Sequence, residues 1–170
     1  MGSYIVTGAA SGIGAAVVAR LQADGEKVIG LDRQDADIIA DLSTVSGRQG
    51  AVEQCLNACP EGLDGLVCCA GVGGTHPLTS LIPEVNFFGS TALLEGLADS
   101  LASRRGSAVF VSSNSAPHPS DEQYMQALID GNRELLAERL PELSGHQAYS
   151  GSKQAIARWM RHQAPDYARK

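Results

Sequence analysis

Two side chains near the carboxyl end of the chain have the spacing and chemistry of an acid–base pair. Tyr149 and Lys153 stand at positions i and i+4, which places a phenol and an ammonium on one face of a helix. A free tyrosine ionises at about pH 10 and is a poor base at neutral pH, but a neighbouring cation favours the phenolate. The pair therefore predicts a general acid/base for the hydroxyl of an alcohol, with the hydride passing to a bound cofactor.

A glycine-rich turn near the amino terminus has the composition of a phosphate cradle. The segment Thr7-Gly8-Ala9-Ala10-Ser11-Gly12-Ile13-Gly14 lies between an apolar, strand-like run and a helical stretch. A pyrophosphate has to approach backbone N–H groups at the helix N-terminus, and side chains at Gly8, Gly12 and Gly14 would block that approach. The Lys-Ser/Thr ending of a nucleoside-triphosphate loop is absent, so the turn indicates a dinucleotide site.

Asp32 ends the next strand-like run and is placed to select the dinucleotide. A carboxylate there accepts hydrogen bonds from the adenosine ribose hydroxyls and repels a 2′-phosphate, which favours NAD over NADP. The alternative is that Asp32 only caps a surface turn, and Arg33 beside it softens the preference for NAD. Asp41, after a third short strand, is placed for the adenine edge, with a solvated loop acid as its alternative role.

Taken together, these motifs resemble those of the short-chain dehydrogenase/reductase family, across essentially the whole chain. They are Thr7-Gly8-x-x-x-Gly12-x-Gly14, Asp32, Asn86, Ser113 and Tyr149-x-x-x-Lys153. The resemblance implies an NAD(P)-dependent oxidoreductase that acts on CH–OH donors, with Asn86, Ser113, Tyr149 and Lys153 as its catalytic residues. In that family the serine hydrogen-bonds the substrate oxygen, and the asparagine holds a water that links the lysine to solvent.

The resemblance also implies which residues hold the cofactor. These are Gly8, Ser11, Gly12, Ile13, Gly14, Asp32, Asp41, Leu42, Ala70, Gly71, Tyr149 and Lys153. NAD is the expected cofactor, NADP is less favoured, and no metal site is expected.

Three further segments look like the bacterial 3α-hydroxysteroid dehydrogenase/carbonyl reductase subgroup of that family. They are residues 28–32, 39–44 and 62–67. An inserted segment that precedes the tyrosine and contributes to the dimer contact is also typical of the subgroup. The resemblance implies a secondary alcohol or ketone as substrate, such as a 3α-hydroxysteroid or another carbonyl compound, and a homo-oligomer, either a dimer or a tetramer.

The elements that position these residues alternate between short β-like runs and helical stretches, which is typical of a parallel sheet with crossover helices. The strands are expected at 4–7, 27–32, 38–40, 63–69 and 108–112. The helices are expected at 12–24, 44–59, 84–104 and 147–162. We expect an α/β fold with a Rossmann-type doubly wound parallel sheet in three α/β/α layers, and a single dinucleotide-binding and catalytic domain over residues 1–170.

Residues 116–145 stand out from this alternation as a charged, leucine-rich insertion. Its leucines fit a helix with one apolar stripe: Leu128, Leu135, Leu136, Leu140 and Leu143. The stripe either packs on this domain or meets another subunit, and an inserted helix favours the second.

The chain departs from the family pattern at two places. The family usually has Asn-Asn-Ala-Gly after its fourth strand, where this chain has Cys68-Cys69-Ala70-Gly71, so other groups have to tie the sheet together. The chain also stops at Lys170, just after the catalytic helix, so the fold is expected to be truncated and the chain to be a fragment. The fifth strand would then be an uncovered apolar edge.

Composition excludes several other classes of protein. The net charge of −6 argues against a nucleic-acid partner, and no apolar run is long enough for a membrane-spanning helix. The amino terminus lacks the pattern of a signal peptide, which indicates the cytoplasm. The four cysteines lack zinc-ligand spacing and are expected to be reduced thiols in the core.

Two other functions remain open from the sequence. The first is a non-catalytic NAD(H)-binding module or an inactive fragment. The second is a methyltransferase, which would use the glycines and Asp32 for its own cofactor but would leave Tyr149 and Lys153 idle.

Overall fold

A computed structural model describes residues 1–169 of the chain. The residues divide into two compact units, which we call the sheet unit (Met1–Ala70 and Gly89–Val111) and the helical unit (Gly71–Phe88 and Ser112–Arg169). The prediction of a single domain stays a prediction, and each unit is described by itself.

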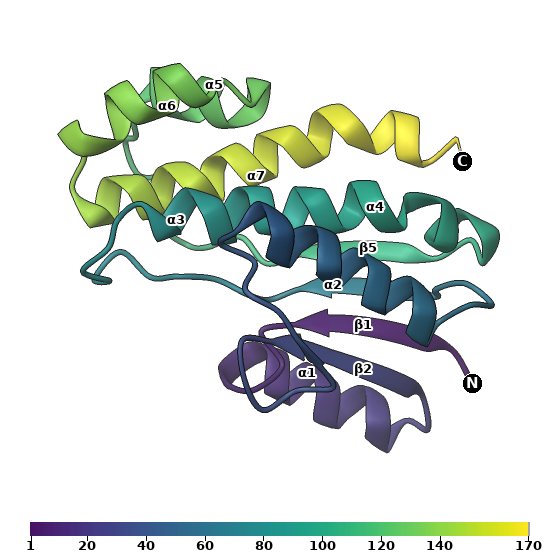
Figure 1. The fold of residues 1–170 in the computed structure, drawn as a ribbon. Coiled ribbons are helices and arrows are strands. Elements are labelled where there is room, and N and C mark those ends of the chain that lie inside the picture. The colour runs from purple at the N-terminus through teal and green to yellow at the C-terminus, as the bar shows by residue number, and fades with distance from the viewer. Residues whose placement is uncertain (170) are drawn as a thin grey trace. The chain divides into compact units, whose positions relative to one another are not determined.

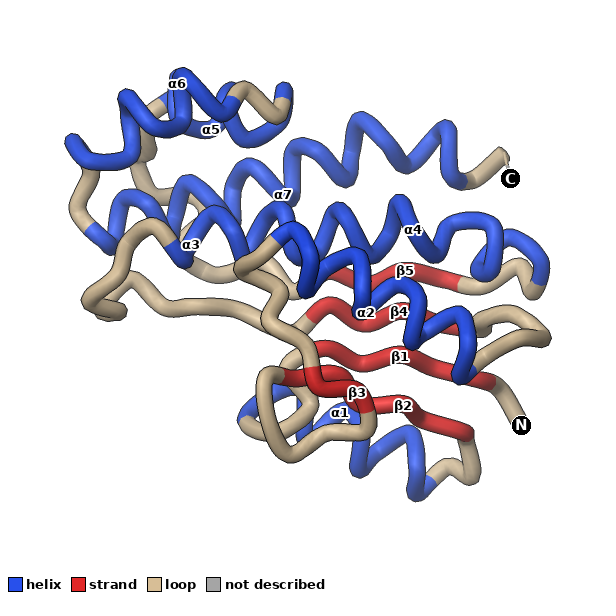
Figure 2. The backbone as a smooth tube through the Cα atoms, in the orientation of Figure 1, coloured by secondary structure: helices blue, strands red, loops and turns tan. Residues whose placement is uncertain are grey.

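The sheet unit is built on five parallel strands in the order β3-β2-β1-β4-β5, which lie side by side in Figure 2. Their bounds are β1 Ser3–Thr7, β2 Lys27–Asp32, β3 Ile38–Ile39, β4 Gly65–Cys68 and β5 Ser107–Phe110. In the central strand, Val6 is in register with Gly30 on one side and Val67 on the other. The chain adds strands β2 and β3 on one side of β1 and then crosses over to add β4 and β5 on the other side. This strand order confirms the expected Rossmann-type sheet.

Three helices cover the two faces of this sheet (Figure 1). They are α1 Gly12–Ala23, α2 Val45–Ala58 and α4 Ser90–Ser103. Because parallel crossovers are right-handed, α1 lies on one face, and α2 and α4 lie on the other. Helices α2 and α4 pack closely, since a Cβ at Gly96 would lie 2.6 Å from a Val52 methyl group. The three-layer arrangement is therefore as predicted.

The cysteines of the sheet unit belong mainly to its core. Cys55 is fully buried, while Cys59 and Cys68 are 3% exposed, and none of the cysteines is in a disulfide. Burial raises the pKa of the Cys55 thiol to about 12. The prediction of thiols that fill core space is confirmed for these three residues.

Strand β5 forms one edge of the sheet and pairs with β4 through a register that aligns Val67 with Val109. Val109 is 52% exposed, so an apolar side chain reaches solvent from this edge strand.

Among the described helices, none is both long enough and apolar enough to cross a lipid bilayer.

The helical unit contains the last and longest helix of the chain, α7 Gly145–Tyr167. The other elements are α3 Leu81–Pro83, the π-helical segment η1 Glu84–Gly89 (of which Gly89 belongs to the sheet unit), α5 Glu122–Asp130, α6 Arg133–Arg139 and the 3-10 turn η2 Leu140–Glu142. Residues 84–104 were predicted to form one regular helix, but the first six residues have the wider π-helical turn.

The insertion is two helices rather than the single helix predicted from its leucines. Gly131, at φ +65°, ends α5 in the left-handed conformation, and the Asn132 side chain then caps α6 by accepting from the Leu135 N–H at 3.0 Å. Leu128 and Leu136 are buried, and α5 packs on both α6 and α7 within the unit. The expectation that the apolar stripe meets another subunit is therefore wrong for these two leucines, which are covered by their own chain.

Replacing Asp121 with Ala is expected to destabilise the helical unit by about 1–2 kcal/mol, because Asp121 caps α5. Its Oδ1 accepts from the Tyr124 N–H at 2.6 Å and its Oδ2 accepts from Arg139 at 2.6 Å. The Arg139 hydrogen bond is the main cause that lowers the pKa of Asp121 below 3.8, so its stabilisation is present above that pH and is lost as pH falls through the lowered value.

Urea unfolding of both proteins at neutral and at acidic pH measures this effect. The difference between wild type and Asp121→Ala should be largest at neutral pH and should shrink in acid. The control is Asp166→Ala, which removes an exposed ion pair with Arg169 but no cap. An equal loss of stability in both variants would contradict the capping role.

Candidate active site

The glycine-rich turn is shaped so that backbone atoms are its innermost surface. A Cβ at Gly14 would lie 2.1 Å from the Gly8 carbonyl oxygen, and one at Gly8 would lie 2.9 Å from the Ala70 nitrogen. Gly8 and Gly12 have φ of +69° and +54°, in the left-handed region that favours glycine. Among the described residues, Ser11 makes no side-chain cap to α1, so the first N–H groups of this helix can receive an anion.

Asp32 is tied to this turn by its own carboxylate. Its Oδ2 accepts from the Ala10 N–H at 3.0 Å, and its Oδ1 accepts from the Arg33 N–H at 2.6 Å. The bond to Ala10 fixes the end of β2 against the turn that follows β1. The structure thus places Asp32 beside the glycine turn, and its role in binding a cofactor stays a prediction.

The segment at Asp41 and Leu42 is also held in place within the sheet unit. Asp41 accepts hydrogen bonds from Ser43, which lower the pKa of its carboxyl group, and the buried Arg48 donates to the Leu42 carbonyl at 3.0 Å. Asp41 itself is exposed. The buried Arg48 was not predicted from the sequence, because its position in a helix gives no sign that it turns back to this loop.

Thr7 makes a hydrogen bond between two strand ends, at the place where the family usually has asparagines and this chain has Cys68 and Cys69. The Thr7 side chain is buried, and its Oγ1 accepts from the Ala70 N–H at 2.9 Å. This bond joins the end of β1 to the residues that follow β4. It therefore provides part of the cross-sheet tie beside Cys68 and Cys69.

In the helical unit, Tyr149 and Lys153 share one face of α7, as predicted. The Lys153 Nζ lies 5.9 Å from the centre of the Tyr149 ring. Lys153 is 5% exposed and Tyr149 is half-buried. A largely buried ammonium beside a partly accessible phenol is suited to proton transfer at the phenol oxygen.

Asn86 lies in η1 and is almost fully buried. Its Oδ1 accepts from the Val72 N–H at 2.7 Å, and its Nδ2 donates to the Val72 carbonyl and to the Ser152 Oγ, both at 3.1 Å. Ser152 in turn donates to the Tyr149 carbonyl at 2.7 Å. The side chain of Asn86 therefore anchors α7 at the residue before Lys153, and its role in holding a water stays a prediction.

The loop after β5 is attached to the same helix. Ser112 donates to the Lys153 carbonyl at 2.9 Å, which ties the segment that carries Ser113 to α7. The Ser113 hydroxyl accepts from Ser115 Oγ at 2.9 Å. Ser112 and Ser152 were missed by sequence reasoning, because only the folded contacts distinguish them from the other serines.

The predicted site residues therefore fall into two groups. The sheet unit contains those expected to bind the cofactor at the strand ends: Gly8, Ser11, Gly12, Ile13, Gly14, Asp32, Asp41, Leu42 and Ala70. The helical unit contains Gly71, Asn86, Ser113, Tyr149 and Lys153. In the sheet unit, Asp32 is hydrogen-bonded to the glycine turn and Ala70 to Thr7, and in the helical unit Asn86 is hydrogen-bonded to α7 through Ser152.

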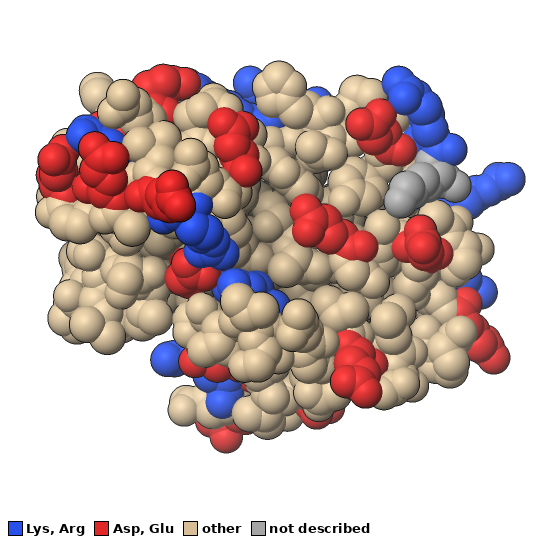
Figure 3. Space-filling view, turned by 45° about the horizontal axis from the view of Figure 1, so that its top comes forward, with Lys and Arg blue, Asp and Glu red and all other residues tan. Residues whose placement is uncertain are grey.

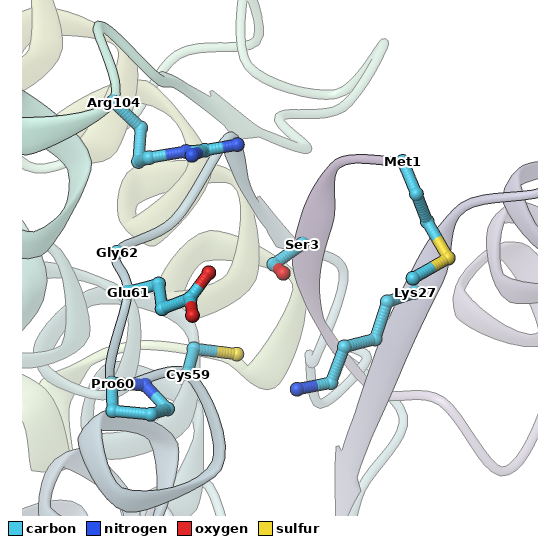
Figure 4. A pocket seen from close by; sticks show the side chains of 8 residues that line it. All are labelled: Met1, Ser3, Lys27, Cys59, Pro60, Glu61, Gly62 and Arg104. Atoms are coloured by element: carbon cyan, nitrogen blue, oxygen red, sulfur yellow. The ribbon is translucent and has the colours of Figure 1, made fainter.

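A pocket of about 310 Å³ lies at the other end of β1 from the glycine turn (Figure 4). Ser3 and Lys27, which begin β1 and β2, line it together with Cys59 and Arg104. Lys27 donates to the Ala58 carbonyl at 2.7 Å, and Arg104 pairs with Asp64 at 3.3 Å. Burial raises the pKa of the Cys59 thiol, which stays protonated at neutral pH.

The charged side chains on the face drawn in Figure 3 are mixed in sign. Lys and Arg side chains there lie among carboxylates and do not gather into one basic patch among the described residues. The absence of a nucleic-acid partner stays a prediction.

The chain matches known proteins over most of its length. A family profile described as short chain dehydrogenase matches residues 3–125. The chain is 36% identical over 162 residues to the 3-alpha-hydroxysteroid dehydrogenase/carbonyl reductase of Comamonas testosteroni, which covers 92% of this chain and 63% of that protein. It is 40% identical over 99 residues to a coniferyl-alcohol dehydrogenase of a Pseudomonas strain, over 55% of this chain and 37% of that protein.

A solved structure is similar at the level of the fold and the sequence. The crystal structure of the 3-alpha-hydroxysteroid dehydrogenase from Pseudomonas sp. B-0831 complexed with NADH has a TM-score of 0.92 and 45% identity. The match covers 98% of this chain and 67% of that one. This chain thus spans less than two thirds of the Comamonas relative's length.

Proposed function

This chain belongs to the short-chain dehydrogenase family, and from that premise we propose that it transfers a hydride between NAD(H) and a secondary alcohol or its ketone. The observation that carries the proposal is the largely buried Lys153 ammonium, 5.9 Å from the ring of the more accessible Tyr149. We propose that residues 1–170 act as one dinucleotide-binding and catalytic domain.

In this proposal Tyr149 is the general acid/base. During oxidation its phenolate takes the proton of the substrate hydroxyl, and during reduction the phenol returns that proton to the carbonyl oxygen. The Lys153 ammonium stabilises the negative charge that develops on the substrate and phenol oxygens during this transfer, and the Ser113 hydroxyl hydrogen-bonds the substrate oxygen. The nicotinamide, when bound, supplies or accepts the hydride.

The glycine turn and Asp32 support NAD as the cofactor. The bare backbone at Gly8 and Gly14 leaves room for a pyrophosphate at the start of α1, and the Asp32 carboxylate, fixed by Ala10, is positioned to accept from ribose hydroxyls. The negative charge of Asp32 opposes a 2′-phosphate. The crystal structure of the Pseudomonas sp. B-0831 relative is a complex with NADH, which agrees with this choice.

The names of two relatives support the proposed substrate class. The Comamonas protein and the Pseudomonas sp. B-0831 protein are both named for 3α-hydroxysteroids, and the first also for carbonyl reduction, so we propose a 3α-hydroxysteroid or a related carbonyl compound. We also propose that the protein assembles as a dimer or a tetramer.

The direct test is NADH formation by the encoded protein with a 3α-hydroxysteroid and with simple secondary alcohols, together with calorimetric titration of NAD and NADP. Turnover with NAD supports the proposal. NAD binding without turnover on any of these alcohols would favour a binding module, and binding of neither dinucleotide would exclude both.

Replacing Asp32 with Asn is expected to reduce the preference for NAD over NADP by about tenfold or more, since the charge that repels the 2′-phosphate is removed. The ratio of the two dissociation constants, measured by titration, checks this. The control is Asp130→Asn, which removes the same charge from an exposed position in α5. An unchanged ratio in Asp32→Asn, or a preference of the wild type for NADP, would remove Asp32 from cofactor selection.

A further inference from the structure

We propose that Tyr124, in the inserted helix α5, is a positioning residue that fixes the rotation of α7 and so the direction in which Tyr149 and Lys153 point. The inference deepens the proposed function and rests on it for its catalytic consequence. Its structural part stands on contacts within the helical unit alone.

The first contact is between the Tyr124 ring and the backbone of Gly151. Tyr124 is fully buried, and a Cβ at Gly151 would lie 2.8 Å from its Cε1 and 2.9 Å from its Cδ1. Gly151 stands between Tyr149 and Lys153 in the sequence. The ring therefore packs directly on the part of α7 that carries the catalytic pair, where only a residue without a side chain leaves it space.

The second contact is a hydrogen bond from the Tyr124 hydroxyl to the Ala148 carbonyl, at 3.2 Å. Burial is the main cause that raises the pKa of Tyr124, so its hydroxyl is a neutral donor at physiological pH. Ala148 is fully buried and directly precedes Tyr149. Because Ala148 and Tyr149 are successive residues of one continuous helix, a rotation of α7 about its axis at Ala148 turns Tyr149 by the same angle.

Two further contacts hold the same segment along α7. The Ser120 and Ser150 hydroxyls are 3.2 Å apart, and Glu122 forms an ion pair with Arg158. A helix held at several points along its length, one of them a ring packed against a glycine, cannot turn about its axis without losing packing. The insertion thus acts on the catalytic helix from the side of Ala148 and Gly151.

The test exchanges volume between the two partners. Tyr124→Leu removes the ring, and Gly151→Ala adds a methyl group where the ring lies. The double variant Tyr124→Leu/Gly151→Ala combines the smaller side chain with the added methyl group. Tyr124→Phe keeps the ring and removes only the hydrogen bond to Ala148. Tyr4→Leu is the control, because it removes a tyrosine ring that packs on Gly65 in the sheet unit.

Tyr124→Leu and Gly151→Ala are each expected to lower kcat by about tenfold to a hundredfold, as misplacement by about 1 Å does, with the KM for NAD nearly unchanged. Their pH–rate profiles should differ from that of the wild type, because Lys153 no longer lies beside Tyr149 in the same geometry. The double variant should recover part of kcat. Tyr124→Phe should show a smaller change in the same direction, and Tyr4→Leu should keep the wild-type pH profile.

The proposal is overturned if folded Tyr124→Leu and Gly151→Ala keep the wild-type kcat and pH profile, or if their losses simply add in the double variant. If a single variant does not fold, Tyr124→Phe and the double variant decide by the same criteria. A fluorinated tyrosine placed at position 149 gives a readout without turnover, since its fluorine resonance should shift in Tyr124→Leu and not in Tyr4→Leu. An inactive wild type would contradict the proposed function, while the resonance would still decide the role of Tyr124.

Discussion

Tyr149→Phe is expected to lower kcat for alcohol oxidation by about a thousandfold while the affinity for NAD changes little, because a general acid/base contributes about 10²–10⁴ in rate. The substitution removes only the phenol oxygen, and the ring still packs on α7 beside Lys153, whose Nζ is 5.9 Å from its centre. Steady-state kinetics and NAD titration together separate the loss of proton transfer from a loss of binding.

The matched control is Tyr167→Phe, which removes a phenol oxygen from the other end of the same helix. That variant should keep the wild-type rate. Equal rates in wild type and Tyr149→Phe would remove Tyr149 from the mechanism and would leave the NAD(H)-binding module as the better reading of the chain.

Gly14→Ala is expected to weaken NAD binding by about tenfold or more and to lower the free energy of unfolding by about 1–3 kcal/mol, as overpacking does. The new Cβ would stand 2.1 Å from the Gly8 carbonyl oxygen and 2.9 Å from the Thr7 carbonyl oxygen, so the turn has to open. Backbone atoms cannot move aside as a flexible side chain does, which is why the change reaches the phosphate cradle. NAD titration and urea unfolding measure the two effects.

Gly50→Ala is the matched control in the same unit. Gly50 lies in α2 with nothing within 4 Å of an added Cβ, so alanine there should be neutral or stabilise the protein by about 0.5–1 kcal/mol. If Gly14→Ala bound NAD as tightly as Gly50→Ala, the glycine turn would not be the cofactor cradle.

The sheet and its cradle could be predicted from the sequence because local signals determine them. Short apolar runs separated by helical stretches gave five strands within a few residues of their observed bounds, and the glycines between β1 and α1 mark close backbone approaches. The π-helical turn at Asn86 and the break at Gly131 were missed, since an apolar periodicity continues through both.

The predicted site residues were found by motif, but the groups that hold them were not. Thr7 binds the Ala70 N–H, and Ser112 binds the Lys153 carbonyl, across 63 and 41 positions of the chain. Such pairs depend on tertiary packing, and the position of a serine or threonine in the sequence does not indicate which distant backbone group it will bind. The contacts of Tyr124 with α7 were not predicted either, because the sequence shows this residue only as part of a leucine-rich insertion.

The burial of the cysteines also affects how readily their thiols react with oxidants and electrophiles. Cys55 combines full burial with a pKa of about 12, and Cys59 and Cys68 are almost as inaccessible, whereas Cys69 is partly open to solvent. Because alkylation and peroxide oxidation need an accessible thiolate, we expect both reactions to be slower at the three buried thiols than at Cys69 in the native fold. The residue that follows β4 beside the cradle is thus the natural point for attaching a single reporter dye.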